Sequence, residues 1–413
     1  MQAPTENICI YDAKIKNGDE FVGIRMENGF PRVYFPTGYR HAKDIREQRR
    51  DILNLISVLS VYGNRNEFKP STYGNNSQVF PIHAYIGVFT YYLNYGYFSE
   101  REAVYNRRRT GKIDWGRTVK QIQPQWSQDD PIYLEYIVKR STSNETSLLT
   151  QIHQYCVYEA YQRLGCLFTA TEPAKPSIKY NEALFVSVLQ AKIASSFNEK
   201  HLTLFKQMLD IIRSLGTDGN RNIQFYGTND FEYIWEGLID KVFGISPKDR
   251  REYYPKTTWH LENGTSTDVD TELEKSALRP DTIMLYKRND IPGIYILDAK
   301  YYRYGITKQP TSLPGSSSIN KQFTYAEYVE TLECAKDSRI YNAFIMPYNA
   351  DAANNAADYG IKNIGYATGN WKQNGKTYEK IHGILLDVKT LMHSHTRHPT
   401  KAMDRLAELI ETA

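Results

Sequence analysis

Residues 279–302, RPDTIMLYKRNDIPGIYILDAKYY, are the stretch that decides the fold. Two apolar runs flank a polar segment at 287–293 that contains Asn-Asp and Pro-Gly, a pattern typical of a β-hairpin. Because hairpin strands run antiparallel, Asp281 at the start of the first strand returns to the level of Asp298 and Lys300 at the end of the second. Strand side chains alternate between faces, so Asp298 and Lys300 project from the same side, ~7 Å apart along the strand.

Two carboxylates and an ammonium group at one end of an apolar hairpin suit a metal-dependent hydrolytic site. Two close carboxylates repel each other, and a hard divalent cation such as Mg²⁺ offsets that repulsion and takes oxygen ligands. A bound metal lowers the pKa of a water molecule and stabilises charge on a phosphoryl oxygen. If the register brings Asp281 to the face of Asp298, both are candidate metal ligands, and Lys300 can orient or deprotonate the attacking water. The alternative is an ordinary hairpin with solvated charges at its end.

The motifs Pro280-Asp281 and Asp298-Ala299-Lys300 resemble those of the PD-(D/E)XK nuclease superfamily. In that superfamily a helix before the hairpin often supplies another acid to the metal. The resemblance implies that role for Glu236, in the helix that the pattern at 231–239 predicts. A solvated helix face is the alternative for Glu236.

Some members of the superfamily also carry Gln and Tyr on a helix after the hairpin, near the active site. The counterparts here are Gln322 and Tyr325, in a helix expected near 321–333. The resemblance implies a catalytic-site position for Gln322, although the usual spacing is Q-x-x-x-Y and this chain has Q-x-x-Y.

A second group of charges lies in residues 101–120, which hold seven Lys and Arg against two acids, a local excess of +5. Arginines beside an aromatic side chain suit phosphate contact and base stacking. We therefore expect contact with duplex DNA or with a partner protein, and a solvated basic turn is the alternative on charge alone. The candidate DNA-binding residues are Arg107, Arg108, Arg109, Lys112 and Arg117.

Composition sets bounds on the class of protein. The chain has 413 residues, 41% hydrophobic and 24% charged, which is ordinary for a soluble globular protein. Its net charge is only +4, so nucleic-acid binding has to come from local patches rather than from a uniform basic field. The 33 tyrosines suit interfaces and base stacking as well as plain cores.

The cysteines and the apolar runs indicate a reducing, aqueous environment. The four cysteines form no CxxC pair, which argues against zinc ribbons and a disulfide framework. The first residues lack the pattern of a signal peptide, and no apolar run approaches the ~20 residues that span a bilayer. We expect a cytoplasmic protein without a membrane partner.

The chain divides by composition into three expected segments. Residues 1–75 are expected to be β-rich and are a possible docking site for a partner. Residues 76–215 are expected to be mostly helical and to contact DNA or a partner, and residues 216–413 to form the nuclease domain. The predicted fold class is therefore α/β, with a C-terminal PD-(D/E)XK-type core of a mixed sheet flanked by helices.

Local patterns predict helices over 148–164 and over two further stretches of the middle segment. Ser99 and Glu102 have the form of a capping box for a helix running into 103–109. The apolar periodicity of 183–215 predicts a helix whose role is core.

Two motifs resemble functional sites without fulfilling their requirements. The stretch 369–377 resembles a P-loop but has five residues between its glycines instead of four, and Asn374-Gly375 favours a hairpin turn. His393, His395 and His398 suggest a metal site, but their polar surroundings favour an exposed segment.

Taken together, the chain resembles the LlaJI-type restriction endonuclease family, which is related to the McrC nuclease subunits. The residues that carry the resemblance are the Arg-x-x-Gly-Lys-Ile-Asp-Trp run at 108–115, Phe231-Glu-Tyr-Ile-Trp-Glu236, Arg279-Pro-Asp281, Asp298 through Gly305, and Ser316 through Gln322. They span about residues 80–390.

The resemblance implies a restriction, phage-defence system in which this chain cuts unprotected DNA with Mg²⁺. It also implies an McrB-like GTPase motor in trans, companion cytosine methyltransferases, and a role for Asp281, Asp298 and Glu236 as metal ligands. Two other interpretations stay open: a repair or recombination nuclease of the same superfamily, and a non-catalytic DNA-binding scaffold with a degenerate site.

Overall fold

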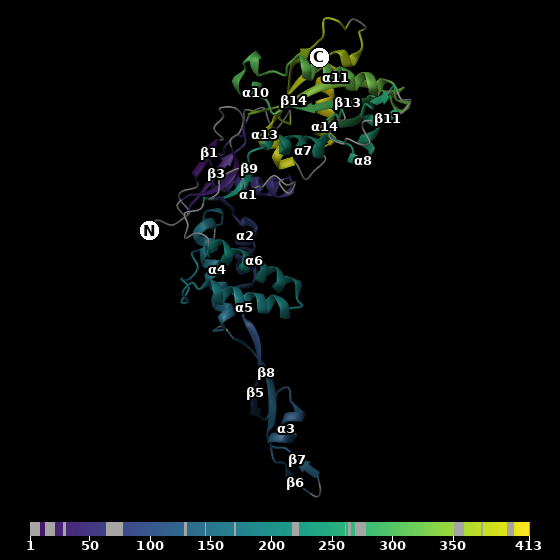
Figure 1. Ribbon diagram of the computed structural model, residues 1–413. Helices are drawn as coiled ribbons and strands as arrows, with labels where there is room; N and C mark the ends of the chain where they lie inside the picture. Colours follow the sequence, from purple (N-terminus) through teal and green to yellow (C-terminus); the bar gives the residue numbers. More distant parts are fainter. Residues whose placement is uncertain are drawn as a thin grey trace. The chain divides into compact units, whose positions relative to one another are not determined.

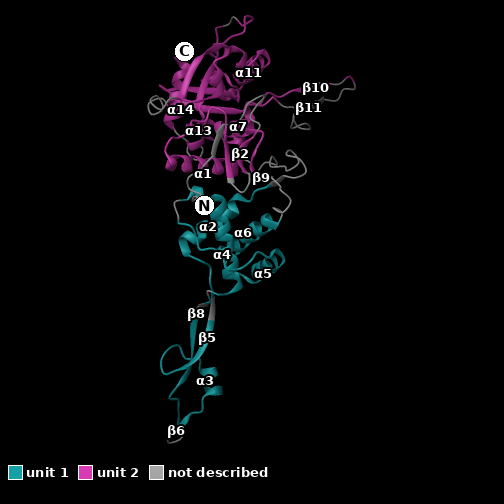
Figure 2. Cartoon of the chain, turned by 90° about the vertical axis from the view of Figure 1, so that its left-hand side faces the viewer, with its two compact units in different colours: residues 1–7, 28–30, 73–224 teal, residues 8–27, 31–72, 225–413 magenta. Residues whose placement is uncertain are grey.

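The structure is a computed structural model (Figure 1). It describes residues 9–12, 21–27, 30–62, 77–127, 130–144, 146–168, 171–216, 223–260, 262, 266–268, 278–350, 359–372, 375–394 and 400–412. The chain forms two compact units, coloured separately in Figure 2. Unit 1 comprises residues 1–7, 28–30 and 73–224, and unit 2 comprises residues 8–27, 31–72 and 225–413. The division into the segments 1–75, 76–215 and 216–413 stays a prediction.

Unit 2 is built on a five-stranded mixed sheet in the order β12-β13-β14-β16-β15. The outer pairs β12/β13 and β15/β16 are antiparallel, and the inner pairs β13/β14 and β14/β16 are parallel. This confirms the expected mixed sheet of an α/β unit. The strands are β12 (Thr282–Arg288), β13 (Ile291–Ala299), β14 (Arg339–Tyr348), β15 (Ile361–Ala367) and β16 (Ile381–Asp387).

The hairpin turn is shorter than the polar segment 287–293 suggested. Asn289 and Asp290 have φ values of 50° and 66°, and they alone separate the two strands. Two consecutive left-handed residues give a two-residue turn whose twist matches that of the strands. Pro292 and Gly293 therefore lie inside β13, paired with β12, and not in the turn.

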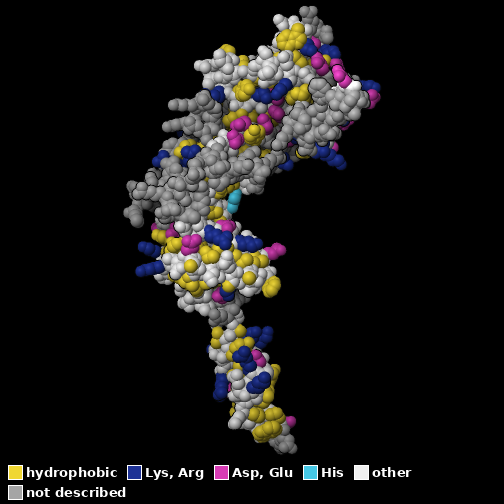
Figure 3. Space-filling view, in the orientation of Figure 1, with side chains coloured by type: hydrophobic (Ala, Val, Ile, Leu, Met, Phe, Trp, Pro, Cys, Tyr) yellow, Lys and Arg dark blue, Asp and Glu magenta, His cyan; other side chains and the backbone are white. Residues whose placement is uncertain are grey.

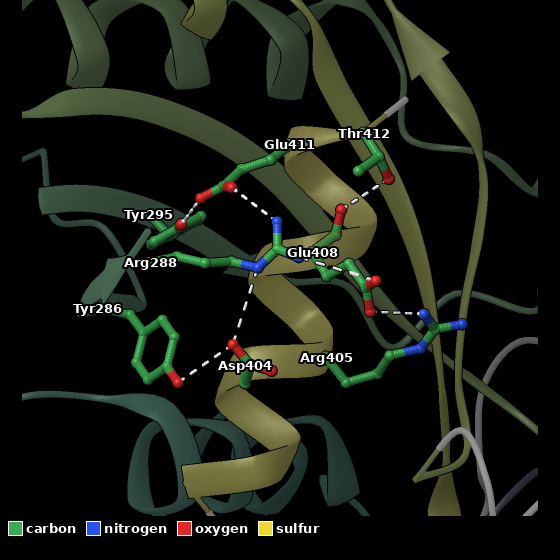
Figure 4. A network of polar contacts seen from close by, with 8 residues as sticks. All are labelled: Tyr286, Arg288, Tyr295, Asp404, Arg405, Glu408, Glu411 and Thr412. Atoms are coloured by element: carbon green, nitrogen blue, oxygen red, sulfur yellow. Dashed lines mark hydrogen bonds and ion pairs between the residues drawn. The ribbon is translucent and has the colours of Figure 1, made fainter. Parts of the chain in front are cut away.

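Helices cover both faces of this sheet. α11 (Ser316–Glu330) packs on β13 and β14, where its apolar side chains join Ile283 and Ile296 in one cluster. On the opposite face lies α14 (Thr400–Glu411). Figure 4 shows the polar contacts that hold α14 on the sheet. Nη1 of Arg288 on β12 lies 3.1 Å from Oε2 of Glu411, and the Tyr295 hydroxyl on β13 donates a hydrogen bond to the same carboxylate.

The rest of unit 2 includes a small sheet with neighbours in the order β1-β3-β2-β9. The expected strands near residues 8–11, 21–26 and 31–35 are confirmed, while Asn28-Gly29 between the last two lies outside the described residues. The elements are β1 (Cys9–Asp12), β2 (Val22–Glu27), β3 (Phe30–Phe35), α1 (Ile45–Tyr62), β9 (Ile223–Thr228), α7 (Phe231–Phe243), α8 (Pro247–Arg250), β10 (Thr258–His260), β11 (Ser266–Asp268), α10 (Tyr304–Thr307) and α13 (Val388–Ser394).

In the residues that the structure describes, unit 1 has four longer helices and a two-stranded arm within residues 100–144 (Figure 1). The helices are α2 (Ile82–Tyr95), α4 (Leu148–Leu164), α5 (Glu182–Ser195) and α6 (Glu199–Gly216). The arm pairs β5 (Glu100–Arg108) with β8 (Tyr136–Asn144) and carries α3 (Trp115–Gln121), β6 (Gln125–Ser127) and β7 (Asp130–Ile132). The short strand β4 (Ser77–Val79) precedes α2.

Two helix predictions in this unit are wrong. The helix expected over 103–109 is the strand β5, because nine consecutive residues pair with β8 and this pairing outweighs a capping pattern of two residues. The helix expected over 183–215 is interrupted between Ser195 and Glu199, where Asn198 caps α6 by accepting from the backbone N–H of His201.

Candidate active site

The open end of the β12/β13 hairpin brings together a half-buried acid, Asp281, and a buried one, Asp298. Thr282 pairs with Leu297, so Asp281 lies level with Asp298, as the hairpin prediction required. Oδ2 of Asp281 accepts a hydrogen bond of 2.8 Å from the backbone N–H of Ala299. Asp298 is 6% exposed, and its Oδ2 lies 2.6 Å from Nζ of Lys300. The predicted group of two carboxylates and one ammonium therefore exists as a contiguous cluster.

The electrostatics of this cluster show an excess of negative charge. Burial, followed by the charges of Asp298 and Glu236, raises the pKa of Asp281 to about 8, against the opposing effects of Lys300 and the Ala299 N–H. Burial also raises the pKa of Glu236. Burial disfavours the ammonium form of Lys300, but the adjacent Asp298 outweighs it and raises the lysine's pKa. Lys300 is therefore held protonated, and one further positive charge would be needed for the acids to ionise together.

Glu236 reaches the cluster from α7, and the sheet fixes that helix in place. The indole N–H of Trp235 donates to the carbonyl of Ile345 on β14 over 3.3 Å, and the backbone N–H of Lys300 donates to the same carbonyl over 2.9 Å. The ring of Tyr301 lies 5.9 Å from the Trp235 ring. One carbonyl thus sets the positions of both Lys300 and the residue next to Glu236.

Arg250, at the end of α8, is a site residue that the sequence patterns did not reveal. Its Nη1 donates to the carboxylate of Asp240 on α7 and to the backbone carbonyl of Asp281. This guanidinium group ties the helix that carries Glu236 to the residue that carries the first acid. An open pocket next to it is lined by these residues together with Tyr62, Tyr233 and Gly237. No local motif marks an arginine that acts through a carbonyl, so only the fold identifies it.

The helix α11 approaches the cluster with Tyr325. Its hydroxyl donates to the carbonyl of Arg279 over 3.2 Å, and burial together with the charges of Asp298 and Asp281 raises its pKa. Gln322, one turn earlier, is fully buried, and its amide has no hydrogen-bond partner in the part of the chain that the structure describes. The structure thus places Tyr325 beside the acids and Gln322 on the same buried face of α11.

The donor set fits a hard divalent cation that shares its coordination with a substrate. Within the described ranges, no group of three or more His, Cys, Asp or Glu side chains has the arrangement of a ready-made metal site. Mg²⁺ is usually held by one or two carboxylates, with water and phosphate oxygens completing its coordination. Asp281 and Asp298, with Glu236 nearby, match that mode, and the raised pKa of Asp281 marks the charge that a cation would neutralise.

The predicted DNA-binding residues lie on the arm of unit 1. Arg107, Arg108, Arg109 and Lys112 are exposed, and Arg117 lies over the ring of Tyr105 at 3.6 Å. Figure 3 shows Lys and Arg side chains next to hydrophobic ones on this part of the surface. The hydrophobic side chains include Trp115, 54% exposed, and Trp126, 71% exposed. The arm therefore combines the two features that suit contact with a nucleic acid or a protein.

The structure describes the remaining sequence motifs only in part. His393 lies on α13 and contacts Asp51 on α1 at 3.2 Å, and Lys389 contacts the same carboxylate at 2.6 Å. This is a contact between two helices of unit 2. His395, His398 and Asn374 lie outside the described residues.

Comparison with known proteins shows the family. The family model of the LlaJI restriction endonuclease matches residues 21–364. The chain belongs to the LlaJI restriction endonuclease family. The matched range includes all five predicted catalytic-site residues and the whole arm, which confirms the resemblance inferred from the motifs.

Two individual proteins are similar to this LlaJI-family chain. It is 25% identical over 343 residues to the type II restriction enzyme BsuMI component YdjA of Bacillus subtilis (strain 168), a match that covers 79% of this chain and 72% of that protein. A solved structure of Thermococcus gammatolerans McrB AAA+ hexamers with bound McrC matches 94% of this chain and 83% of that chain, at 15% identity and a TM-score of 0.36. Among the described helices, none is long and apolar enough to cross a membrane.

Proposed function

We propose that this LlaJI-family chain is the Mg²⁺-dependent endonuclease subunit of a restriction system and hydrolyses phosphodiester bonds of unprotected duplex DNA. The observation that supports this most strongly is the adjacent pair Asp281 and Asp298, with Lys300 in contact with Asp298. Family membership supports nuclease activity, and the chemistry of the acids supports a metal-dependent reaction.

The residues have distinct roles in this proposal. Asp281 and Asp298 hold the cation, with Glu236 as the third acid near it. When bound, Mg²⁺ supplies positive charge that stabilises the phosphoryl oxygens. Lys300, held protonated by Asp298, donates a hydrogen bond that orients the attacking water rather than accepting its proton. Glu236, whose pKa is raised by burial, is suited to accept that proton.

The proposal extends to partners. An McrB-like GTPase acts in trans as a motor, and companion cytosine methyltransferases protect the host DNA. The support is the family membership together with the similarity to a protein named as one component of a type II restriction enzyme. The exposed basic and aromatic side chains of the arm are suited to hold DNA or to dock the motor.

Cleavage of a supercoiled unmethylated plasmid tests the proposal. Wild type and Asp298→Ala are compared in Mg²⁺ and in EDTA, each with and without the candidate GTPase and GTP. Asp290→Ala is the matched control, because the Asp290 side chain is 96% exposed in the hairpin turn. We expect wild type and the control to cut in Mg²⁺ with the partner and GTP, and Asp298→Ala to be inactive. A folded Asp298→Ala protein that still cuts would refute the assignment.

A repair nuclease of the same superfamily is the second candidate. The same assay separates the two functions, since a repair enzyme would prefer ends or junctions and would not depend on methylation.

A further inference from the structure

The pocket beside Arg250 opens from the candidate active site along α7, and we call it the α7 pocket. Its lining includes two of the candidate catalytic acids, Glu236 and Asp281, together with Tyr62 and Tyr233. Its volume is about 200 Å³, below the ~300–1,000 Å³ of pockets that enclose whole small-molecule ligands. A pocket of this size and place suits one unit of a longer molecule whose reacting group lies at the acids.

The residues of α7 that line the pocket form one stripe of the helix. Tyr233, Glu236, Gly237 and Asp240 stand at positions i, i+3, i+4 and i+7, which share a helix face. A Cβ at Gly237 would lie 2.8 Å from Cδ1 of Tyr62, so a side chain there would collide with that ring. The Tyr62 ring therefore lies directly against the backbone of α7 and forms an aromatic wall of the pocket.

Tyr233 is the exposed side chain of this stripe, with 56% of its surface accessible. A single exposed aromatic side chain is ordinary on a protein surface. Tyr233 differs from such a side chain because it lies one helical turn from Glu236 and lines the same pocket as the acids. An accessible aromatic ring next to a site for phosphodiester chemistry is suited to stack on a base.

The charges of the lining decide which part of a nucleotide the pocket suits. Glu236, Asp240 and Asp281 are acids, and Arg250 is the one cation among the lining residues that the structure describes. Nη1 of Arg250 already donates to the Asp240 carboxylate and to the Asp281 carbonyl. A phosphate in the pocket would meet more acids than cations, whereas a base is neutral and has an aromatic face. The lining therefore favours a base over a phosphate.

A base that enters this pocket is unpaired. Bases in a duplex are stacked and paired, so a base has to leave the helix, or come from a single strand, before it can lie against Tyr233. We propose that the α7 pocket holds the base of the nucleotide next to the scissile phosphate, stacked on Tyr233 and bordered by Tyr62. This inference rests on the proposed function and specifies its substrate: the LlaJI-family chain takes DNA whose base next to the cut is unpaired.

Two homopolymer oligonucleotides test the inference without knowledge of the cut position. One is a fluorescently labelled octamer of thymidylate, and the other is a labelled octamer of abasic tetrahydrofuran units with the same number of phosphates. The full-length Lys300→Gln protein keeps the acids and lacks the group that orients the water. It is titrated into each octamer in Ca²⁺, and anisotropy is recorded. Adding Tyr233→Ala should lower thymidylate affinity about tenfold, the scale of one aromatic–base stack, and leave abasic affinity unchanged.

Two further variants serve as controls. Tyr233→Phe keeps the ring and should bind the thymidylate octamer as the parent protein does. The matched control is Tyr366→Ala, because Tyr366 is also exposed in unit 2, at 51%, and is not among the residues that line the α7 pocket. It should leave both affinities unchanged. Thermal unfolding midpoints establish that each variant is folded.

Photo-crosslinking locates the bound base, which is needed because the arm of unit 1 also exposes aromatic side chains. An octamer with 5-iodouracil bases is irradiated in the complex, and the linked peptide is identified by mass spectrometry. We expect a link to the α7 peptide that carries Tyr233. Links confined to the arm would overturn the inference.

The outcomes separate this inference from the proposed function. Unchanged thymidylate affinity in Tyr233→Ala overturns the inference, even if Asp298→Ala abolishes plasmid cleavage. An equal loss for both octamers indicates contact with the sugar–phosphate chain and also overturns it. A loss for thymidylate alone, with the link to α7, supports the pocket even if the wild type cuts no plasmid tested.

Discussion

The stability of the metal-free protein should fall as the pH rises from 6 to 8, and Asp281→Asn should remove much of that fall. The pKa of Asp281 is raised from its usual 3.8 to about 8, so the folded state holds a proton that the unfolded chain releases near pH 4. The sign follows from linkage: the native state binds more protons throughout this window, so each rise in pH favours unfolding. Stability is highest below pH 4 with respect to this one group.

The size of the effect follows from the same shift. One pKa unit corresponds to ~1.36 kcal/mol, so a group that titrates at about 8 instead of 3.8 loses about 2 kcal/mol of unfolding free energy between pH 6 and pH 8. For a unit of this size that amounts to about 5 °C in the melting temperature.

The assay is thermal or urea unfolding in EDTA at pH 6, 7 and 8, with wild type, Asp281→Asn and the exposed control Asp290→Asn. Asparagine keeps the oxygen that accepts from Ala299 and cannot ionise. Wild type and control should lose stability with pH, while Asp281→Asn should change less and be more stable than wild type at pH 8. Adding Mg²⁺ at pH 8 should stabilise wild type and not Asp281→Asn. Parallel pH profiles for wild type and Asp281→Asn would refute the reasoning.

Three further predictions concern other contacts. Arg250→Ala removes the hydrogen bonds that link Asp240 to the Asp281 carbonyl. The Mg²⁺ concentration for half-maximal plasmid cleavage should therefore rise ~10–100-fold, with Arg250→Lys in between. An unchanged Mg²⁺ dependence would contradict this role of Arg250. Changing Arg107, Arg108 and Arg109 together to Ala should reduce the slope of log binding constant against log salt concentration for duplex DNA by ~0.9 per lost phosphate contact. The control that changes Lys287, Lys336 and Lys401 to Ala should leave this slope as in wild type. Equal slopes for the two triple variants would rule out a DNA-binding role for the arm. Asp51→Asn leaves Lys389 without its carboxylate and should lower the unfolding free energy by ~3 kcal/mol in urea titrations, and a loss below 1 kcal/mol would count against a structural role.

The hairpin and its acids could be predicted because the relevant signals are local. Apolar runs, a turn dipeptide and the alternation of a strand fix the level of Asp281, Asp298 and Lys300 within a few residues of chain. The strand β5 could not be predicted in the same way. Its partner β8 begins 28 residues after β5 ends, and the pairing with that distant segment overrides the capping pattern at Ser99 and Glu102.

The contacts that complete the site share one physical feature that explains why sequence patterns missed them. Trp235 donates to the carbonyl of Ile345, Arg250 to the carbonyl of Asp281, and Tyr325 to the carbonyl of Arg279. Every residue has a carbonyl, so the acceptor's identity leaves no trace in the sequence, and only the donor is chemically specific.

These three donors come from α7, α8 and α11, which meet at the ends of β12 and β14; α8 closely follows α7 in the chain, whereas α11 begins 66 residues after α8 ends. The carboxylates of Asp281 and Asp298 repel each other when both are ionised. When no cation is bound, other contacts are therefore required to hold the backbone that carries them. Neutral or cationic donors aimed at carbonyls meet that need, because they fix the acids' main chain without neutralising the carboxylates themselves. The carboxylate oxygens are thereby left to a cation that would displace the proton of Asp281, and the three donors lie outside the local pattern of Asp281, Asp298 and Lys300.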